Sequence, residues 1–404
     1  MKISMTKRRK AFTIVILGLL SAIVPFSIDM YLPGFPDIAR SLGTTVSRVA
    51  LSLSSFFVGI AIGQLAYGPI LERFGRKTPL YAGLALYCIA SVGCSFAGSI
   101  EVLIALRLVQ AIGACSAAVA ATAMVRDLFP PGENAQIFSF LMLVVSASPM
   151  LAPTLGGAIT DKFGWSAIFL VLTVLIAAIL LCAFFFLPES KPADQSYSLD
   201  AFSILQTYKS VVTEPYFKTY SFAGAMSYAG LFTYIASSPG IFMGSYGLSR
   251  QQYGFLFAFM ALGLIIASQV NSFWLKSRSS EQIVARVLVA QILLGLGLVV
   301  LSVLHLTGFW IVVALLFGFL STVGFIMPNS SALSMQPFAQ NAGSAAALLG
   351  FVQMGLGSLA SVVVGVLDIK TVLPMSLALV LCSAVGLAIS WGGRTYSKVA
   401  LNQA

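Results

Sequence analysis

The chain has 404 residues, of which 58% are hydrophobic and only 9% charged, and its mean hydropathy of +0.96 excludes an ordinary soluble domain. The formal net charge of +10 does not indicate a nucleic-acid partner, because the basic residues follow the membrane topology described below. The composition therefore predicts an all-α protein embedded in a lipid bilayer.

Apolar stretches of about 20 residues recur along the whole chain, and each is long enough to cross a hydrocarbon core of about 30 Å. Short charged turns, or turns with glycine and proline, separate them. They predict twelve spans whose ends carry an error of about 2 to 4 residues. The expected spans cover residues 12–33, 46–70, 78–98, 101–124, 136–159, 165–187, 217–239, 250–272, 282–304, 308–330, 341–366 and 370–391.

The distribution of Lys and Arg predicts the orientation of the chain. With the N-terminus inside, most basic residues fall in cytoplasmic loops, and the positive-inside rule then places both termini in the cytoplasm. The outer loops hold Arg40, Arg48, Lys162, Arg250 and Lys370. The basic start followed by an apolar run resembles a signal peptide, but the run continues without a cleavage site, so we expect an uncleaved first span.

The first span ends in "PFSIDMYLPGFPDI", residues 25–38, which places Asp29 at membrane depth. A carboxylate there is costly and usually faces a cavity or a partner. Counting about 1.5 Å per residue puts Asp29 and Arg107, of the fourth span, in the same outer third of the membrane. We therefore expect the two to form an ion pair, which either couples proton binding to a helix motion or only fixes spans one and four together.

Between spans two and three the chain reads "GPILERFGRKTPL", residues 68–80. Gly68 is expected to allow close helix approach, Gly75 a tight turn, and Glu72 an ion pair with Arg76. The order of glycines and charges resembles motif A of the major facilitator superfamily, with Glu72 in place of the usual aspartate. We expect a cytoplasmic gate whose charges pair in the outward-open state and separate in the inward-open state. Its expected members are Gly68, Glu72, Arg73, Gly75, Arg76, Lys77 and Asp127.

Span four carries Arg107, Gln110 and Gly113 at intervals of three residues, so the three share one helix face. This arrangement resembles motif B of the same superfamily, whose arginine is associated with proton-coupled transport. By position, Gln110 is expected to hold the arginine or the substrate in the alternate state.

Span five contains "SPMLAPTLGGAI", which is similar to motif C, the motif that marks the antiporters of the superfamily. Pro153, Gly156 and Gly157 match this motif, while Ser148 and Ala152 stand at its first two glycine positions. All of these residues are small, so close packing against a neighbouring helix is still expected.

Hydrophobicity collapses between Pro188 and Lys218, the only long polar segment inside the chain. It separates six spans from six, as in a fold of two parallel repeats around a central cavity. We therefore expect one six-helix half over residues 1–187, a cytoplasmic linker over 188–216 and a second six-helix half over 217–404. Within the linker, "DAFSILQTYKSVV" fits either a short amphipathic helix on the membrane surface or a plain tether.

Polar, aromatic and methionine residues of the spans are candidates for the cavity wall, although each also fits an interhelical hydrogen bond or simple packing. The candidates are Met30, Tyr31, Gln110, Tyr228, Tyr234, Asn329 and Gln353. The sequence has no phosphate-binding loop, metal-ligand cluster or nucleophile motif, which excludes a self-contained ATP-driven pump and gives no catalytic residue, metal or cofactor. A membrane enzyme would need paired catalytic groups, for which only Asp29 and Arg107 qualify.

The stretch "SIDMYLPGFPDIA" resembles the first-span signature of the Bcr/CflA group of drug:proton antiporters, and "MVRDLFPPGENA" fits the same group. Together with motifs A to C, the resemblance covers almost the whole chain. It implies the major facilitator fold with twelve transmembrane helices, a monomer in the bacterial inner membrane, and export of small molecules of the bicyclomycin or chloramphenicol type in exchange for protons. The alternative on the same fold is a proton-coupled exporter or importer of an endogenous metabolite.

Overall fold

The computed structural model describes residues 6–194, 199–338, 342–367 and 371–401, and every regular element within them is a helix. Lys370, expected in an outer loop, lies outside these residues. Twelve helices are long. They are α1 (Lys7–Asp29), α3 (Val46–Phe74), α4 (Lys77–Ser95), α5 (Ile100–Leu128), α6 (Pro131–Phe163), α7 (Ser166–Phe186), α9 (Pro215–Ser238), α10 (Arg250–Trp274), α11 (Ser280–Val303), α12 (Phe309–Met335), α13 (Ala342–Val366) and α14 (Val372–Leu401).

Four shorter helices connect them. A 3₁₀ turn, η1 (Leu32–Gly34), and α2 (Phe35–Ser41) follow α1, and a π-helical turn, η2 (Pro239–Ser245), follows α9. Helix α8 (Ala201–Thr213) forms in the linker, so the amphipathic stretch is a helix and not a plain tether. Asp200 caps it by accepting the backbone N–H of Ser203 at 2.9 Å.

Eleven helices in the described part of the chain are long and apolar enough to cross a membrane. Helix α9 is also of membrane length, with 24 residues, but it is rich in Ser, Thr, Tyr and Gly. Most of its residues are buried against α12, α13 and α14. Its polar composition therefore reflects a place inside the bundle, where small and polar residues mediate helix contacts.

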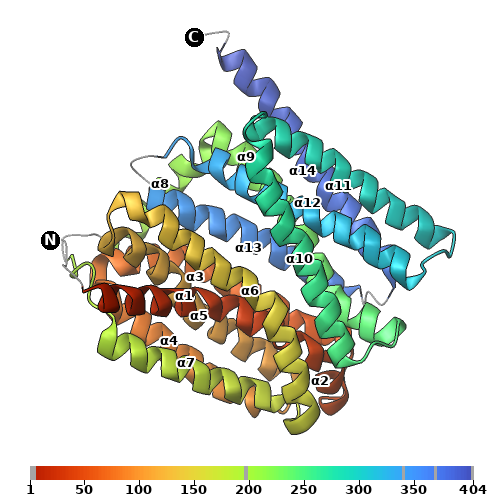
Figure 1. Cartoon of the computed structure of the whole chain (residues 1–404), viewed down its shortest axis with the longest axis horizontal. Coiled ribbons are helices and arrows are strands. Elements are labelled where there is room, and N and C mark those ends of the chain that lie inside the picture. Colours follow the sequence, from red (N-terminus) through yellow and green to blue (C-terminus); the bar gives the residue numbers. More distant parts are fainter. Residues whose placement is uncertain (1–5, 195–198, 339–341, 368–370, 402–404) are drawn as a thin grey trace.

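The long helices form two groups (Figure 1). In the first half, α1 to α7, helix α5 packs against α1, α3 and α4. In the second half, α9 to α14, helix α9 packs against α12, α13 and α14. The halves meet along two long contacts, α3 with α13 and α6 with α10, so a path through the molecule has to run between these helix pairs.

The bundle has two distinct ends. We use "linker end" for the end with α8 and the turn between α3 and α4, and "distal end" for the end with α2 and the start of α10. At the linker end, Gly75 adopts φ of 80° between α3 and α4, as the expected tight turn requires. At the distal end, Ser99 caps α5 by accepting the backbone N–H of Val102 at 3.4 Å, which confirms the expected break between spans three and four.

Candidate functional site

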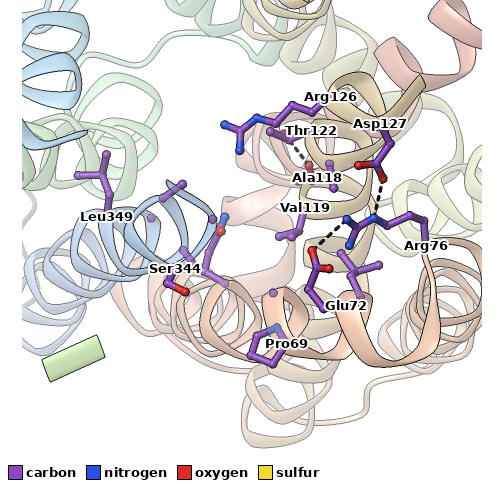
Figure 2. Close-up of a pocket in the computed structure, with 18 of the residues that line it drawn as sticks. Pro69, Glu72, Arg76, Ala118, Val119, Thr122, Arg126, Asp127, Ser344 and Leu349 are labelled. Carbon is purple, nitrogen blue, oxygen red and sulfur yellow. Dashed lines mark hydrogen bonds and ion pairs between the residues drawn. The ribbon is translucent and has the colours of Figure 1, made fainter. Parts of the chain in front are cut away.

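Two cavities lie between the halves, and their walls differ in chemistry. The linker-end cavity has a volume of about 760 Å³ and carries charged side chains from the first half and the linker, with α13 opposite (Figure 2). Its charged residues are Glu72, Arg76, Arg126, Asp127 and Lys191. The central cavity, of about 390 Å³, is lined mainly by apolar and aromatic residues of α1, α6, α9 and α10. Asp29 is the one charged side chain among its described lining residues.

Asp29 is the last residue of α1, is only 4% exposed and lines the central cavity. No hydrogen bond or ion pair joins its carboxylate to any residue in the described part of the chain. Tyr234 lines the same cavity, and its buried hydroxyl also has no hydrogen-bond partner there. Buried polar groups are normally satisfied, so two unpartnered ones on a single cavity wall indicate a site for water, a proton or a ligand.

The expected ion pair between Asp29 and Arg107 is not formed, so that prediction is wrong for this structure. The Arg107 side chain is 0% exposed. One terminal nitrogen donates to Oε1 of Gln110 at 2.6 Å, and the other donates to the backbone carbonyl of Ser27 at 3.1 Å. Equal depth in the membrane did not mean proximity, because Asp29 faces the central cavity while Arg107 lies inside the first half.

Aromatic rings complete the surroundings of Arg107. Its guanidinium carbon lies 4.2 Å from the ring centre of Phe56 and 4.7 Å from that of Tyr31. A desolvated guanidinium gains roughly 2 kcal/mol or more from such a ring face. The site therefore holds the cation without a carboxylate, although Nε of Arg107 has no partner there.

The candidate cavity residues divide into two sets. Tyr228 and Tyr234 line the central cavity, and Gln353 lines the linker-end cavity. The other four are buried and stand on neither wall. They are Met30, Tyr31, Gln110 and Asn329.

All four have structural contacts that explain their burial, and that of Gln110 with Arg107 is described above. The hydroxyl of Tyr31 bonds to that of Ser52 at 2.8 Å, and Asn329 donates to Asn271 at 2.7 Å. The backbone of Met30 packs against Gly156 of α6. At these positions the structure therefore shows the alternative considered from the sequence, which was an interhelical hydrogen bond or simple packing.

The motif A charges form a network on the wall of the linker-end cavity (Figure 2). Nε of Arg76 donates to Asp127 at 2.8 Å, and a terminal nitrogen of Arg76 donates to Glu72 at 2.9 Å. Glu72 also pairs with Lys191. These pairs are intact on a cavity wall that α13 of the other half faces, and their expected separation in the inward-open state stays a prediction. They all lie within the first half and its linker, and the halves can part without breaking them.

Gly68 also differs from expectation. It lies on the cavity wall with nothing within 4 Å of the place where a Cβ would be, so no close helix contact exists there in this state. Of the remaining gate residues, Arg73 and Lys77 do not line the cavity. The ammonium of Lys77 lies 5.5 Å from the ring centre of Tyr81.

No pattern in the sequence indicated that the linker takes part in this network. The carboxylate of Glu189 accepts the backbone N–H groups of Arg76, at 3.0 Å, and Lys77, at 3.2 Å, where α4 begins. The hydroxyl of Ser190 donates to Asp127 at 2.9 Å. The partners of Glu189 lie 112 and 113 residues away in sequence, which is why no local pattern signals these contacts.

One arginine of the second half joins the two halves at the distal end. Nε of Arg250, at the start of α10, donates to Asp37 of α2 at 2.9 Å, and its guanidinium also pairs with Asp161 of α6. The sequence placed Arg250 in an outer loop and predicted no partner for it.

Motif C supports this contact between the halves. A Cβ on Gly156 would overlap the backbone carbonyl of Met30, and one on Gly157 would lie 3.4 Å from Cβ of Arg250. Pro153 lies within α6 on the same stretch. The small residues therefore let α6 pack closely against Met30 of its own half and against Arg250 of the second half, as the motif predicted.

Comparison with known proteins agrees with this architecture. Residues 17–362 match the family model described as Major Facilitator Superfamily. The chain is 30% identical over 389 residues to "Uncharacterized MFS-type transporter YdgK" of Bacillus subtilis, covering 96% of each chain. It is also 30% identical over 384 residues to "Bicyclomycin resistance protein homolog" of Haemophilus influenzae, covering 94% of this chain and 96% of the relative.

Among solved structures, the chain resembles a bacterial homolog of the human lysosomal transporter Spinster in an inward-facing and unoccupied conformation. The TM-score is 0.71 at 14% identity, and the match covers 98% of this chain and 99% of the other, which shows the fold. The family match, the helical bundle and the cavities between its halves agree, and the chain belongs to the major facilitator superfamily, a family of membrane transporters and not of enzymes.

Proposed function

We propose that the protein is an antiporter that exports small, drug-like molecules in exchange for protons. The observation that carries this proposal is the unpaired carboxylate of Asp29 in an apolar cavity between the two halves. The cavity volume of about 390 Å³ lies in the range of small-molecule pockets, about 300–1,000 Å³. The name of the Haemophilus influenzae relative, a bicyclomycin resistance homolog, supports a drug-like substrate.

Exchange follows from competition at Asp29. A bare carboxylate is costly in an apolar cavity at membrane depth, so Asp29 is stable there when it holds a proton or contacts a bound molecule. A substrate that enters from the linker end displaces the proton, and a proton that enters from the distal end displaces the substrate. Each half-cycle then needs one end open and the other closed, as in alternating access.

Arg107 acts on this carboxylate through the backbone of α1. Its hydrogen bond to the carbonyl of Ser27 holds the chain two residues before Asp29. A change in this bond, or in the bond from Arg107 to Gln110, moves the end of α1 and with it the carboxylate. We assign Arg107 and Gln110 this positioning role in place of a direct ion pair.

The linker end faces the cytoplasm of a bacterial cell in this proposal, because the positive-inside rule places the basic N-terminus and the linker there. The proton gradient supplies the energy. A membrane potential of 100 mV contributes about 2.3 kcal/mol per charge, which sustains a gradient approaching about fiftyfold when one net charge moves per cycle.

The test is transport of labelled chloramphenicol by the purified protein in proteoliposomes under an imposed pH gradient. Asp29→Asn keeps the shape and removes the titration, so it should abolish gradient-driven transport, while binding stays measurable without proton release. Glu101→Gln removes a carboxylate of an exposed pair with Arg48 and should transport normally. Uphill transport with a normal pH response in Asp29→Asn would place proton coupling elsewhere. Proton exchange with a cell-extract metabolite but with no drug would favour the metabolite alternative.

A further inference from the structure

Gln64 of α3 stands at the junction of the two cavities. It and Ala118 of α5 are the two described residues that line both of them. On the linker side of this junction the wall is charged, and beyond it the wall is mainly apolar and aromatic up to Asp29. A molecule that travels from the linker end to Asp29 therefore leaves its polar surroundings at Gln64.

The Gln64 side chain also reaches the other half of the molecule. A Cβ on Gly350 of α13 would lie 2.9 Å from Cδ and 3.0 Å from Oε1 of Gln64, so the carboxamide takes this position only because residue 350 has no side chain. No residue in the described part of the chain forms a hydrogen bond with this carboxamide. Two N–H donors and one carbonyl acceptor are therefore free where the cavities join.

We propose that Gln64 is a specificity-determining residue, which selects molecules that carry a neutral amide, carbonyl or hydroxyl group beside an apolar body. Such a group loses its water as it enters the central cavity and is costly there unless a new hydrogen bond replaces the lost one. The Gln64 carboxamide supplies this bond at the point of entry, while Asp29 binds the proton. This inference rests on the proposed transport route and adds a substrate class to it.

The experiment measures equilibrium binding to the purified full-length protein without any gradient. The two probes are chloramphenicol, which carries an amide and hydroxyl groups, and tetraphenylphosphonium, which has no hydrogen-bonding group. Gln64→Leu should weaken chloramphenicol binding by roughly fivefold, the effect of one lost neutral hydrogen bond, and change tetraphenylphosphonium binding less than about twofold. Gln64→Asn keeps the carboxamide and should restore part of the preference.

Glycine variants provide the matched geometric control. Gly350→Ala leaves Gln64 in the sequence but pushes its carboxamide away, so it should lower the preference for chloramphenicol in the same direction as Gln64→Leu. Gly355 lies on the same helix with nothing within 4 Å of its missing Cβ, so Gly355→Ala should leave the preference unchanged. Equal weakening of both probes, or an unchanged ratio of their dissociation constants in Gln64→Leu, would overturn the assignment.

Failure of this inference is distinguishable from failure of the proposed function. Because the assay has no gradient, a Gln64-dependent preference would survive in a protein that binds drugs without exchanging protons, and only the antiport mechanism would then fall. Conversely, proton-coupled transport that depends on Asp29 but shows no Gln64-dependent preference would leave the proposed function standing and remove this selection.

Discussion

Arg107 shows how a single charge is kept inside the first half. The planar guanidinium reaches two oxygen acceptors with separate nitrogens and still presents its faces to aromatic rings. A lysine cannot reproduce this arrangement, because its ammonium is a compact point charge that is strongly hydrated. The residue type therefore matters here as much as the charge.

Arg107→Lys should destabilise the protein by about 1–3 kcal/mol, because hydrogen bonds and ring contacts are lost while a buried charge remains. Arg126, on the same helix, lines the linker-end cavity and makes no ion pair with the described residues, so Arg126→Lys should change stability by less than about 0.5 kcal/mol. Chemical unfolding in detergent compares the two. Equal losses of stability in the two variants would show that the buried contacts of Arg107 do not stabilise the protein more than those of an exposed arginine.

For single residues, the sequence predicted how deep a side chain lies in the membrane but not the direction in which it points. It identified Asp29 and Arg107 as functional candidates, because charges are rare in the spans, and it placed Gln110 on the helix face of Arg107. Which way a side chain points from its helix depends on the rotation of that helix in the bundle. The pattern could not supply that rotation for α1, since Pro25 and the 3₁₀ turn at 32–34 interrupt its period.

Among the elements, the linker contacts both halves and is more than a tether. Pro69 inside α3 has no N–H, which leaves the carbonyl of Leu65 without its helical donor. The hydroxyl of Tyr208, in α8, donates to this carbonyl at 2.9 Å. Val211 of α8 packs with Leu348 of α13, so one short helix contacts both halves at the linker end.

Glu189→Gln should loosen the linker at the start of α4. It removes the negative charge that faces two backbone N–H groups at a helix N-terminus, an effect of about 0.3–1 kcal/mol. Hydrogen exchange of the backbone amides of Arg76 and Lys77 should therefore become faster by roughly two- to fivefold. Glu281→Gln, in the first turn of α11 and outside this network, is the control. An unchanged rate would show that Glu189 does not hold the linker.

Much of the local structure at the linker end was predicted from the sequence, but the contacts of the linker were not. The turn at Gly75 and the pair of Glu72 with Arg76 follow from local spacing, and the helix in the linker was one of the two alternatives that its pattern allowed. The contacts of Glu189 and Tyr208 join residues more than a hundred positions apart, and no local period carries that information.

At the scale of the whole molecule, the structure is closed at one end and open at the other. Eleven of the expected spans match helices that are apolar enough to cross a membrane, and the more polar α9 is a twelfth long helix, but hydropathy did not predict which end is closed. That closure depends on pairs between halves, such as Arg250 with Asp37, which are 213 residues apart. The motif A pairs, in contrast, lie within the first half and its linker, so they cannot by themselves report which end is open.

Arg250→Ala should shift the molecule toward the state that is open at the distal end. Partly exposed ion pairs are worth about 0–1 kcal/mol each, so losing two of them changes the ratio of the states by up to roughly thirtyfold. Spin labels on the two halves at the linker end should then show a larger population with a short distance between the labels, because the linker end closes when the distal end opens. Arg48→Ala is the control, because Arg48 pairs with Glu101 at the same end but within the first half. If both variants keep the parent distance distribution, Arg250 does not hold the distal end closed, and the close packing of α10 on α6, where a Cβ on Gly254 would lie 3.2 Å from Cα of Thr154, becomes the better explanation of that closure.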